Sequence, residues 1–483
     1  MKLKDPALLK TNAYINGSWI AGDSTYTVLN PYDNSPLAEV ADLGEEATNE
    51  AIEAAAAAFK SWSQVPAGER ASILKRWYAL QMEHQEDLAM ILTLEQGKPL
   101  AEAKGEIAYG ASFIEWFAEE ARRTYGEVIP GHQGDKRIIT LKQPVGVVAA
   151  ITPWNFPNAM ITRKVGPALA AGCTVVVKPA EYTPLSALAL AELGERAGIP
   201  KGVLNIVTTN RPAEVGTALT ANPLVRKLSF TGSTAVGKLL LSQCAGTVKR
   251  VSMELGGNAP FIVFDDADLD QAVEGAMIAK YRNAGQTCVC ANRIYVQARV
   301  YNAFVKKLTA AIQQLSSGNG LQPGVAIGPM IDDKALDFVE GVVKDATDKG
   351  AKVLTGGKRG VPAATFFEPT LLTEVNAQMK VHTEEIFGPV APIFRFETEA
   401  EAIKAANDTP FGLAAYFYAR DNARVWRVSE ALEYGMIGVN TGLVSTTVAP
   451  FGGVKESGLG REGSRHGIDE YLELKYVCQG GIG

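Results

Sequence analysis

Short apolar runs alternate with amphipathic stretches between Val145 and Val263, and this alternation constrains the fold more than any other feature of the chain. β-Branched residues in the runs favour strands, and the stretches between them have the apolar spacing of helices. A strand that is apolar throughout is buried on both faces, as in a parallel sheet covered by crossover helices. The first helix is expected to end at Gly172. The expected strands are VGVVAAI (145–151), TVVVK (174–178), VLNIV (203–207), VRKLSF (225–230), VKRVSM (248–253) and PFIVF (260–264), and the expected helices TRKVGPALAAG, LSALALAELGERAG, AEVGTALTAN and AVGKLLLSQCA.

A second α/β stretch is expected from about residue 267 to 454, with strands such as RIYVQ and APIFRF. Two other segments, RIITLKQ (137–143) and YLELKYVCQGG (471–481), alternate apolar and polar residues, and the second has no helix of its own to pack on. Extensions of this kind commonly add a strand to a partner's sheet. We therefore expect a homo-oligomer.

Composition excludes several classes of protein. The 483 residues are 47% hydrophobic and 21% charged, close to the average of a soluble globular protein. A net charge of −6 gives no basic footprint for nucleic acid. The N-terminus is too polar for a signal peptide, and no apolar run approaches the ~20 residues that span a bilayer. Five cysteines in so long a chain make no disulfide framework, so a reducing, cytoplasmic location is expected.

Two segments are candidates for binding a dinucleotide, although the fingerprint G-x-G-x-x-G is absent. In FTGSTAVG (230–237), Gly232 permits close backbone approach and the helix start offers N–H groups to a phosphate, while Ser233 is equally explained as a helix N-cap. In VVKPAE (176–181), Lys178 ends an apolar strand, where ligands of such sheets bind, and Glu181 follows three residues later. The pair could hold the hydroxyls of a ribose or form an ordinary strand end.

Cys288 and Cys290 in NAGQTCVCANR raise the question of a nucleophile. A cysteine in a loop is nucleophilic where a base or a helix dipole favours its thiolate. A metal site is not expected, because the four histidines are dispersed and zinc needs about four ligands. A disulfide across one residue would be strained, and two buried thiols remain a plain alternative. Glu254 lies between an apolar strand and a Gly-Gly turn. It is either an ordinary residue at the start of the turn or a partly desolvated base.

Taken together, these motifs resemble the aldehyde dehydrogenase superfamily. The similarity covers nearly the whole chain through PWNFP (153–157), KPAE (178–181), FTGST (230–234), ELGGNAP (254–260), GQTC (285–288), EEIFGP (384–389) and PFGGVKESGLGRE (450–462). It implies an α/β fold with a Rossmann-type dinucleotide-binding domain (1–121 and 145–256), an α/β catalytic domain (257–456) and a small β oligomerisation arm (122–144 and 457–483). A homodimer or homotetramer is the implied assembly.

The resemblance also implies roles for individual residues. Cys288 would attack the aldehyde carbon, the Asn155 amide and the Cys288 N–H would form the oxyanion hole, and Glu254 would activate the water that hydrolyses the thioester. The positions implied to contact the nicotinamide cofactor are Trp154, Lys178, Glu181, Gly232, Ser233, Glu385 and Phe387. A carboxylate at Glu181 accepts ribose hydroxyls and repels a 2′-phosphate, so NAD is expected in preference to NADP. Arg211, in the departure TTNRP (208–212), could offset this preference.

Within the superfamily the chain is most similar to bacterial succinate-semialdehyde dehydrogenases. Arg163, Arg282 and Ser445 match the residues that hold the distal carboxylate, and Cys290 would close reversibly onto Cys288 under oxidation. The segment LVSTTVAP departs from the LVSNEVAP common in that group, so glutarate semialdehyde or a broader range of aliphatic aldehydes is the alternative substrate. Three further alternatives are a CoA-acylating enzyme, which the retained Glu254 disfavours, a catalytically silent structural relative, which the retained Cys288, Glu254 and Asn155 disfavour, and a thiol hydrolase that uses Cys288 without a cofactor.

Overall fold

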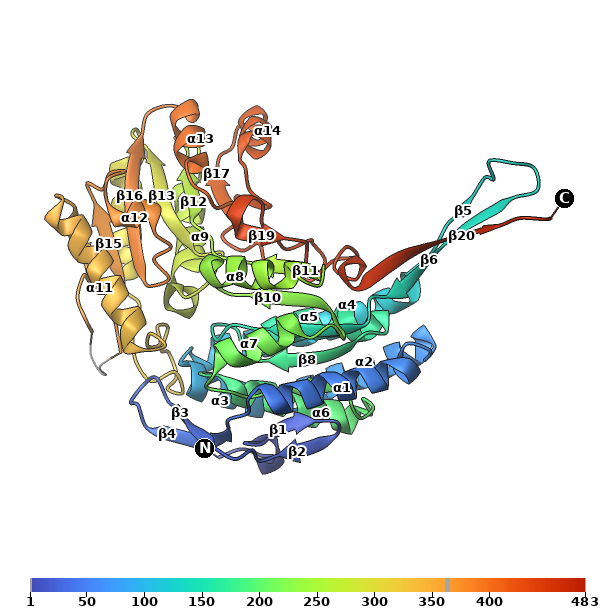
Figure 1. Cartoon of the computed structure of the whole chain (residues 1–483). Helices are drawn as coiled ribbons and strands as arrows, with labels where there is room; N and C mark the ends of the chain where they lie inside the picture. The colour runs from blue at the N-terminus through green and yellow to red at the C-terminus, as the bar shows by residue number, and fades with distance from the viewer. Residues whose placement is uncertain (1, 361–364, 483) are drawn as a thin grey trace.

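Residues 2–360 and 365–482 are described by the structure, a computed structural model, in which two α/β units lie side by side and a β-arm projects from one of them (Figure 1). Each unit is a twisted sheet with helices on both faces. Within the described ranges, no helix is both long enough and apolar enough to cross a membrane.

The first sheet has the strand order β19-β11-β10-β7-β8-β9-β1-β2. Its centre, from β11 to β9, is parallel, and its outer pairings are antiparallel. This confirms the parallel sheet expected from the apolar runs. The strands are β1 (Ala13–Ile15), β2 (Ser18–Ile20), β7 (Val147–Ile151), β8 (Thr174–Lys178), β9 (Leu204–Ile206), β10 (Val225–Thr231), β11 (Arg250–Glu254) and β19 (Gly458–Leu459).

Helices cover both faces of this sheet because successive strand side chains point to opposite sides. On β8, Val175 and Val177 pack in the core beneath α2 to α6, whereas Val176 packs in the core beneath α1, α7 and α8. The helices are α1 (Glu45–Trp62), α2 (Ala67–Glu83), α3 (Gln85–Gln96), α4 (Leu100–Glu120), α5 (Ala159–Ala171), α6 (Pro184–Ala197), α7 (Pro212–Ala221) and α8 (Thr234–Ala245), with 3₁₀ turns η1 (Pro6–Leu8) and η2 (Ala121–Arg123).

Helix α5 ends as its sequence predicts. Gly172 has φ +96°, a left-handed conformation that glycine adopts without steric cost. The N–H groups of Gly172 and Cys173 donate to the carbonyls of Leu169 and Ala168, at 3.1 and 2.9 Å. The chain therefore turns at once into β8, which places Lys178 at the edge of the sheet.

The second sheet has the order β14-β15-β16-β13-β12-β17-β18, with the expected RIYVQ and APIFRF in β13 and β16. The segment PFIVF, expected to close the first series, instead forms β12 and pairs with β13 and β17. Its apolar pattern is the same in either sheet, so only long-range pairing decides its place. The strands are β12 (Ala259–Val263), β13 (Ala291–Gln297), β14 (Lys352–Thr355), β15 (Thr370–Thr373), β16 (Val390–Phe396), β17 (Ala414–Tyr418) and β18 (Met436–Val439).

Helices also flank this second sheet, with separate apolar cores on its two faces. One face packs against α9 and α10, and the other against α11 to α14. The elements are α9 (Leu269–Tyr281), α10 (Tyr301–Ile312), α11 (Asp333–Asp348), α12 (Lys380–Thr383), α13 (Glu399–Asn407) and α14 (Asn422–Ala431), with 3₁₀ turns η3 (Arg282–Gly285), η4 (Lys455–Ser457) and η5 (Asp469–Tyr471).

The projecting arm is an antiparallel sheet of β5 (Val128–Ile129), β6 (Arg137–Pro144) and β20 (Leu472–Gln479), in the order β20-β6-β5 (Figure 1). Its strands join two segments more than 300 residues apart, as in the pair Leu472 and Pro144. Leu474 and Tyr476 leave 71% and 61% of their surface exposed, so the arm offers apolar area. Strand β19 pairs with β11 in the first sheet, although residues 457–483 were all expected in the arm. The oligomeric state stays a prediction.

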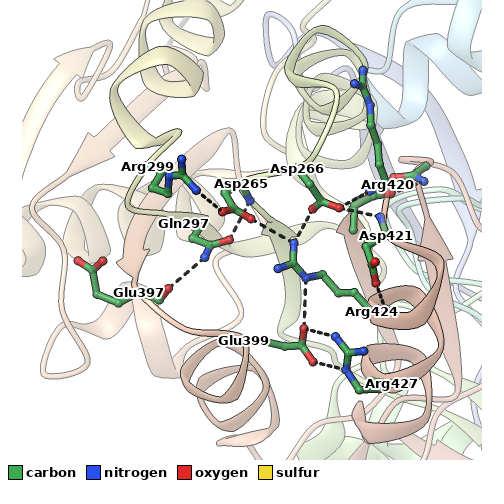
Figure 2. Close-up of polar contacts among 12 residues, drawn as sticks. Asp265, Asp266, Gln297, Arg299, Glu397, Glu399, Arg420, Asp421, Arg424 and Arg427 are labelled. Carbon is green, nitrogen blue, oxygen red and sulfur yellow. Dashed lines mark hydrogen bonds and ion pairs between the residues drawn. The ribbon is translucent and has the colours of Figure 1, made fainter.

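An ion-pair network ties α13 and α14 to the loop after β12 (Figure 2). Arg424 of α14 contacts Asp265 and Asp266 of that loop at 3.2 and 2.5 Å, and Glu399 of α13 at 3.2 Å. Arg427 adds a second pair with Glu399 at 2.9 Å. A network of several charges holds elements in place better than an isolated surface pair does. The remaining hairpin consists of β3 (Thr25–Leu29) and β4 (Pro36–Ala41), which form a separate two-stranded sheet among the strands described.

Candidate active site

The carboxyl ends of three neighbouring parallel strands form one edge of the first sheet. β8, β7 and β10 are adjacent, so Lys178, Ile151 and Thr231 end side by side. Trp154 and Asn155 follow β7, and Gly232 and Ser233 follow β10. Segments remote in the chain meet here because parallel strands end at the same edge, where such sheets bind ligands.

A cavity of about 260 Å³ lies beyond this edge and is bounded on its other side by the second α/β unit. Trp154 and Phe387 meet edge to face within its wall, with ring centroids 5.6 Å apart. The wall contains five of the seven predicted cofactor residues together with Asn155 and Cys288. The lining residues are Pro153, Trp154, Asn155, Phe156, Met160, Thr231, Gly232, Ser233, Leu255, Gly256, Cys288, Glu385 and Phe387.

Cys288 reaches this cavity from a tight turn after α9. The helix ends at Tyr281, and Asn283 and Ala284 have φ of 52° and 55°. Gly285 follows with φ +78°, and a Cβ there would collide with the carbonyl of Gly388. This backbone turns the cysteine away from the helix and into the cavity wall.

The two thiols have different surroundings. All five cysteines are free, and Cys288 is partly exposed whereas Cys290 is 5% exposed. Burial raises the pKa of Cys288 to about 12, against the opposing charge of Arg163. Burial also raises the pKa of Cys290, whose Sγ lies 3.5 Å from the carbonyl of Lys280. The Cys288 thiol therefore needs a nearby proton acceptor before it can attack a carbonyl group.

Asn155 is 5% exposed and is held at both ends of the residue. Its Nδ2 donates to the carbonyl of Gln286 at 3.0 Å, two residues before Cys288. Its own carbonyl accepts from Lys98 Nζ at 2.8 Å and from Asn283 Nδ2 at 3.0 Å. The backbone N–H of Cys288 has no acceptor among the residues described. An amide group and a free N–H are the donors that an oxyanion requires.

Glu254 ends β11 and is 3% exposed. Neither of its carboxylate oxygens has a hydrogen-bond partner within the part of the chain that the structure describes. Burial and the negative charge of Glu462 raise its pKa well above the ordinary value, against the opposing charges of Arg163 and Lys164. A buried carboxylate with a raised pKa is suited to accept a proton near neutral pH.

Arg163, predicted to bind the substrate, is already paired inside the protein. Its Nε donates to Glu462 Oε2 at 2.6 Å, and Lys164 contacts the other oxygen of the same carboxylate. All three side chains are at most 4% exposed. The guanidinium also lies over the ring of Phe451, 4.0 Å from its centroid. Burial alone would raise the pKa of Glu462, but Arg163 and Lys164 outweigh it and lower that pKa to about 2.

Arg282 differs from Arg163 in having no carboxylate within ion-pair distance in the described ranges. It is partly exposed, and its guanidinium lies 5.3 Å from the ring centroid of Phe156, a residue of the cavity wall. Its positive charge acts on the Cys288 thiol, as that of Arg163 does. Ser445 is half-buried on the loop after β18, where the neighbouring Val444 packs in the same apolar core as Cys288.

Lys178 and Glu181 lie at the end of β8, outside this cavity wall, and their charged groups are 3.3 Å apart. Glu181 lines a separate cavity of about 660 Å³ beside β3. Ser233 caps α8, with its Oγ accepting from the N–H of Val236 at 3.4 Å, so the N-cap interpretation is correct. Arg211 contacts Glu214 at 3.0 Å and Asp42 at 3.5 Å.

Sequence reasoning assigned no role to Lys98, Glu106, Lys164 or Glu462. Glu462 closes the motif PFGGVKESGLGRE, yet its partners are about 300 residues away, and nothing local indicates the pairing. Lys98 and Glu106 form a second ion pair, at 2.5 Å, with side chains 0% and 1% exposed. Glu106 and Lys164 lie on helices α4 and α5, whereas Lys98 and Glu462 lie in loops, and no local pattern marks any of the four as buried.

Known proteins are similar to this chain over nearly its whole length. The model of the aldehyde dehydrogenase family matches residues 19–477. A glutarate-semialdehyde dehydrogenase of Pseudomonas aeruginosa is 63% identical over 100% of both chains, and an NADP(+) succinate-semialdehyde dehydrogenase of Escherichia coli is 62% identical over 99% of this chain and 100% of that one. The crystal structure of a succinate-semialdehyde dehydrogenase from Burkholderia pseudomallei is 60% identical, covers 100% of both chains and superposes with a TM-score of 0.99. With this full-length match in sequence and in fold, the chain belongs to the aldehyde dehydrogenase family.

Proposed function

We propose that this chain oxidises succinate semialdehyde to succinate with a nicotinamide dinucleotide, through a covalent intermediate on Cys288. The observation that carries the proposal is the shared cavity wall, which holds the Cys288 thiol, the Asn155 amide and residues from the carboxyl ends of β7 and β10. One wall thus combines a nucleophile, an oxyanion donor and a place for a cofactor.

The residues at this edge fit a nicotinamide dinucleotide. The Gly232–Ser233 turn opens α8 towards the cavity, where N–H groups can hold a phosphate. The buried Thr231 hydroxyl, which has no partner in the described chain, lies in the same wall. Burial raises the pKa of Glu385 to about 8, and one of its oxygens accepts from the N–H of Gly257 at 3.0 Å. Lys178 and Glu181 would hold a ribose, and the bound cofactor would supply the hydride acceptor.

The chemistry assigned to this chain begins with the Cys288 thiol. Its proton passes to Glu254, and the sulfur attacks the aldehyde carbon to form a thiohemiacetal. The oxyanion is held by the Asn155 amide and the Cys288 N–H, donors whose loss typically costs about 10²–10³-fold in rate. After loss of hydride the carbon is a thioester. Glu254 releases the thiol proton to solvent and then takes a proton from the water that attacks the thioester carbon. The tetrahedral intermediate expels the Cys288 thiolate, which takes that proton back from Glu254, and the carboxylic acid leaves.

Recognition of the distal carboxylate is assigned mainly to Arg282. Its guanidinium has no ion-pair partner in the described ranges, whereas the charge of Arg163 is already matched by Glu462. Arg163 then contributes its positive electrostatic field and helps to shape the substrate site, and Ser445 contributes a hydroxyl group. A guanidinium at fixed distance from Cys288 selects an aldehyde with a carboxylate at the matching chain length.

Glutarate semialdehyde is the second candidate substrate. It is favoured by the name of the P. aeruginosa relative and by the departure LVSTTVAP beside Ser445. One extra methylene is discriminated by only about 1–3 kcal/mol in an apolar pocket. Initial rates with semialdehydes of three to six carbons test the choice: we expect the highest kcat/KM with succinate semialdehyde, and a higher value with glutarate semialdehyde would transfer the assignment.

For the cofactor we propose a preference for NAD over NADP. Glu181 places a carboxylate beside Lys178, where a 2′-phosphate would be repelled, and Arg211 is engaged by Glu214 and Asp42. The E. coli relative carries NADP(+) in its name, so the preference needs a direct comparison of the two cofactors at equal concentration. A markedly higher kcat/KM with NADP would refute it.

Two further roles belong to the proposal. Cys290 is proposed to form a reversible disulfide with Cys288 when a peroxide removes two electrons and two protons from the thiol pair. The turn between them is closed by a hydrogen bond from the Cys290 N–H to the Thr287 carbonyl at 3.0 Å.

The projecting arm is proposed to join subunits of a homodimer or homotetramer. Residues 1–121 with 145–256 are proposed to be the dinucleotide-binding domain, beside a catalytic domain of 257–456.

A further inference from the structure

We propose that the buried pair of Lys98 and Glu106 positions Asn155, and that these two residues govern the rate of the chemical step without contacting substrate. The inference rests on the proposed role of Asn155 as an oxyanion donor. It starts from an ion pair that no part of the proposed mechanism uses. The two charged groups are 2.5 Å apart, and their side chains are 0% and 1% exposed.

Burial makes this pair costly unless each group is also satisfied by other partners. Lys98 meets three: the Glu106 carboxylate, the carbonyl of Asn155 at 2.8 Å, and the ring of Phe156, whose centroid is 3.7 Å away. Two of these three partners are consecutive residues of the PWNFP segment. The ammonium group is therefore directed at the segment that carries the oxyanion donor.

Glu106 fixes the same segment from its other end. Its Oε2 contacts Lys98, while its Oε1 accepts from the N–H groups of Asn158 and Ala159 at 3.0 and 3.2 Å. They belong to the N-cap residue of α5 and to its first residue, and such N–H groups have no partner within the helix. The pair thus binds both sides of a four-residue turn, from the carbonyl of Asn155 to the start of α5.

The scaffold beneath the pair is rigid. Glu106 lies on α4, which packs directly on α5, and a Cβ on Gly110 would collide with the Asn158 side chain. Lys98 follows Gly97, whose φ is +95° and whose position has no room for a side chain against Pro329 and Pro31. Neither charged group can shift without moving a packed element, so the pair is a fixed reference for the turn.

The Asn155 side chain receives this restraint directly. With its carbonyl held by Lys98 and by Asn283, the residue directs Nδ2 at the Gln286 carbonyl, two residues before Cys288. An oxyanion donor displaced by about 1 Å can cost 10²-fold in rate. Loss of the pair should therefore lower kcat, whereas KM should change little.

A double-mutant cycle tests this. Lys98→Met with Glu106→Gln removes both charges but keeps an acceptor for the α5 N–H groups, and it is compared in the parent and in the Asn155→Ala background. We expect a fall in kcat of about 10–100-fold in the parent, with KM within about threefold, and less than about threefold further loss in the Asn155→Ala background. Equal loss in both backgrounds, or no loss in the parent, overturns the proposal.

Controls separate positioning from folding and from the mechanism itself. Lys75→Met with Glu119→Gln removes an exposed ion pair of the same length between α2 and α4, and should leave kcat unchanged. Lys98→Arg retains the positive charge and is likewise compared in the parent and in the Asn155→Ala background. It tests the proposal even if the variant with Lys98→Met and Glu106→Gln fails to fold. If Asn155→Ala alone leaves kcat unchanged, the oxyanion role of Asn155 is wrong. If Asn155→Ala lowers kcat but the Lys98 and Glu106 variants do not, only the positioning role of the ion pair is wrong.

Discussion

Glutamine in place of Glu462 removes the negative charge that balances two buried cations. In the parent, one oxygen of this carboxylate contacts Arg163 and the other contacts Lys164, with all three side chains at most 4% exposed. Glutamine has nearly the same shape, so the variant changes charge with little change in packing. Two uncompensated cations would then face Glu254, the other carboxylate of this charge cluster.

The expected loss of stability follows from the pKa of Glu462. It falls from 4.5 to about 2 in the folded protein, and at 1.36 kcal/mol per unit this corresponds to about 3 kcal/mol. A depressed carboxyl pKa gives stability that is fully present above the unfolded value of 4.5 and is lost as pH falls towards 2. Breaking one partner of a buried pair typically costs about 3–5 kcal/mol, which agrees.

The same substitution should move the pH dependence of activity. Burial and the charge of Glu462 raise the pKa of Glu254, and Arg163 and Lys164 oppose them. With the Glu462 charge gone, the cations act unopposed and the pKa of Glu254 falls. The acidic limb of the kcat profile should therefore move to lower pH, even if the maximal rate also decreases.

Two measurements check these results. Denaturant unfolding, followed by tryptophan fluorescence, should give Glu462→Gln a lower midpoint at pH 7 than the parent, with the difference narrowing below about pH 4.5. Steady-state rates between pH 5 and 9 give the acidic limb. Glu119→Gln, which removes a charge from an exposed pair with Lys75, should alter neither the unfolding midpoint nor the acidic limb of the rate profile. An unchanged midpoint, or an acidic limb displaced to higher pH, would refute the charge-balance reasoning.

Three other variants test the proposed function. Glu181→Ser should raise the ratio of kcat/KM with NADP to that with NAD by about tenfold, because roughly 1.4 kcal/mol of repulsion at the 2′-position is removed; an unchanged ratio would exclude Glu181 as the selector. Arg282→Ala should lose about 30-fold or more in kcat/KM on succinate semialdehyde but little on propanal, since truncating one partner of a charge pair costs about 2–5 kcal/mol; equal losses would argue against carboxylate recognition. After peroxide and then dithiothreitol, the parent should regain activity while Cys290→Ala stays inactive; equal recovery of both would contradict a protective disulfide with Cys288.

Local sequence was sufficient where a residue's own neighbours decide its structure. The end of α5 at Gly172 needs only a residue that tolerates φ +96°, and the strands β7 to β10 need only apolar β-branched runs. The motifs around Cys288 and Glu254 also indicated a candidate nucleophile and a candidate base, because each of these roles requires particular side chains whatever surrounds them. These features set the fold class, the family resemblance and the candidate catalytic residues.

Long-range pairing decided what the sequence left open. PFIVF has the apolar pattern of a buried strand in either sheet, and only its pairing with β13 and β17 places it in the second. From the sequence, Arg163 and Arg282 are both candidates to bind the substrate carboxylate. In the structure, Arg163 has a buried carboxylate partner, whereas Arg282 has none in the described ranges. That partner, Glu462, lies 299 residues away. Ion pairing depends on distances below 4 Å and on exclusion of water, and a chain acquires both only when its remote segments pack together.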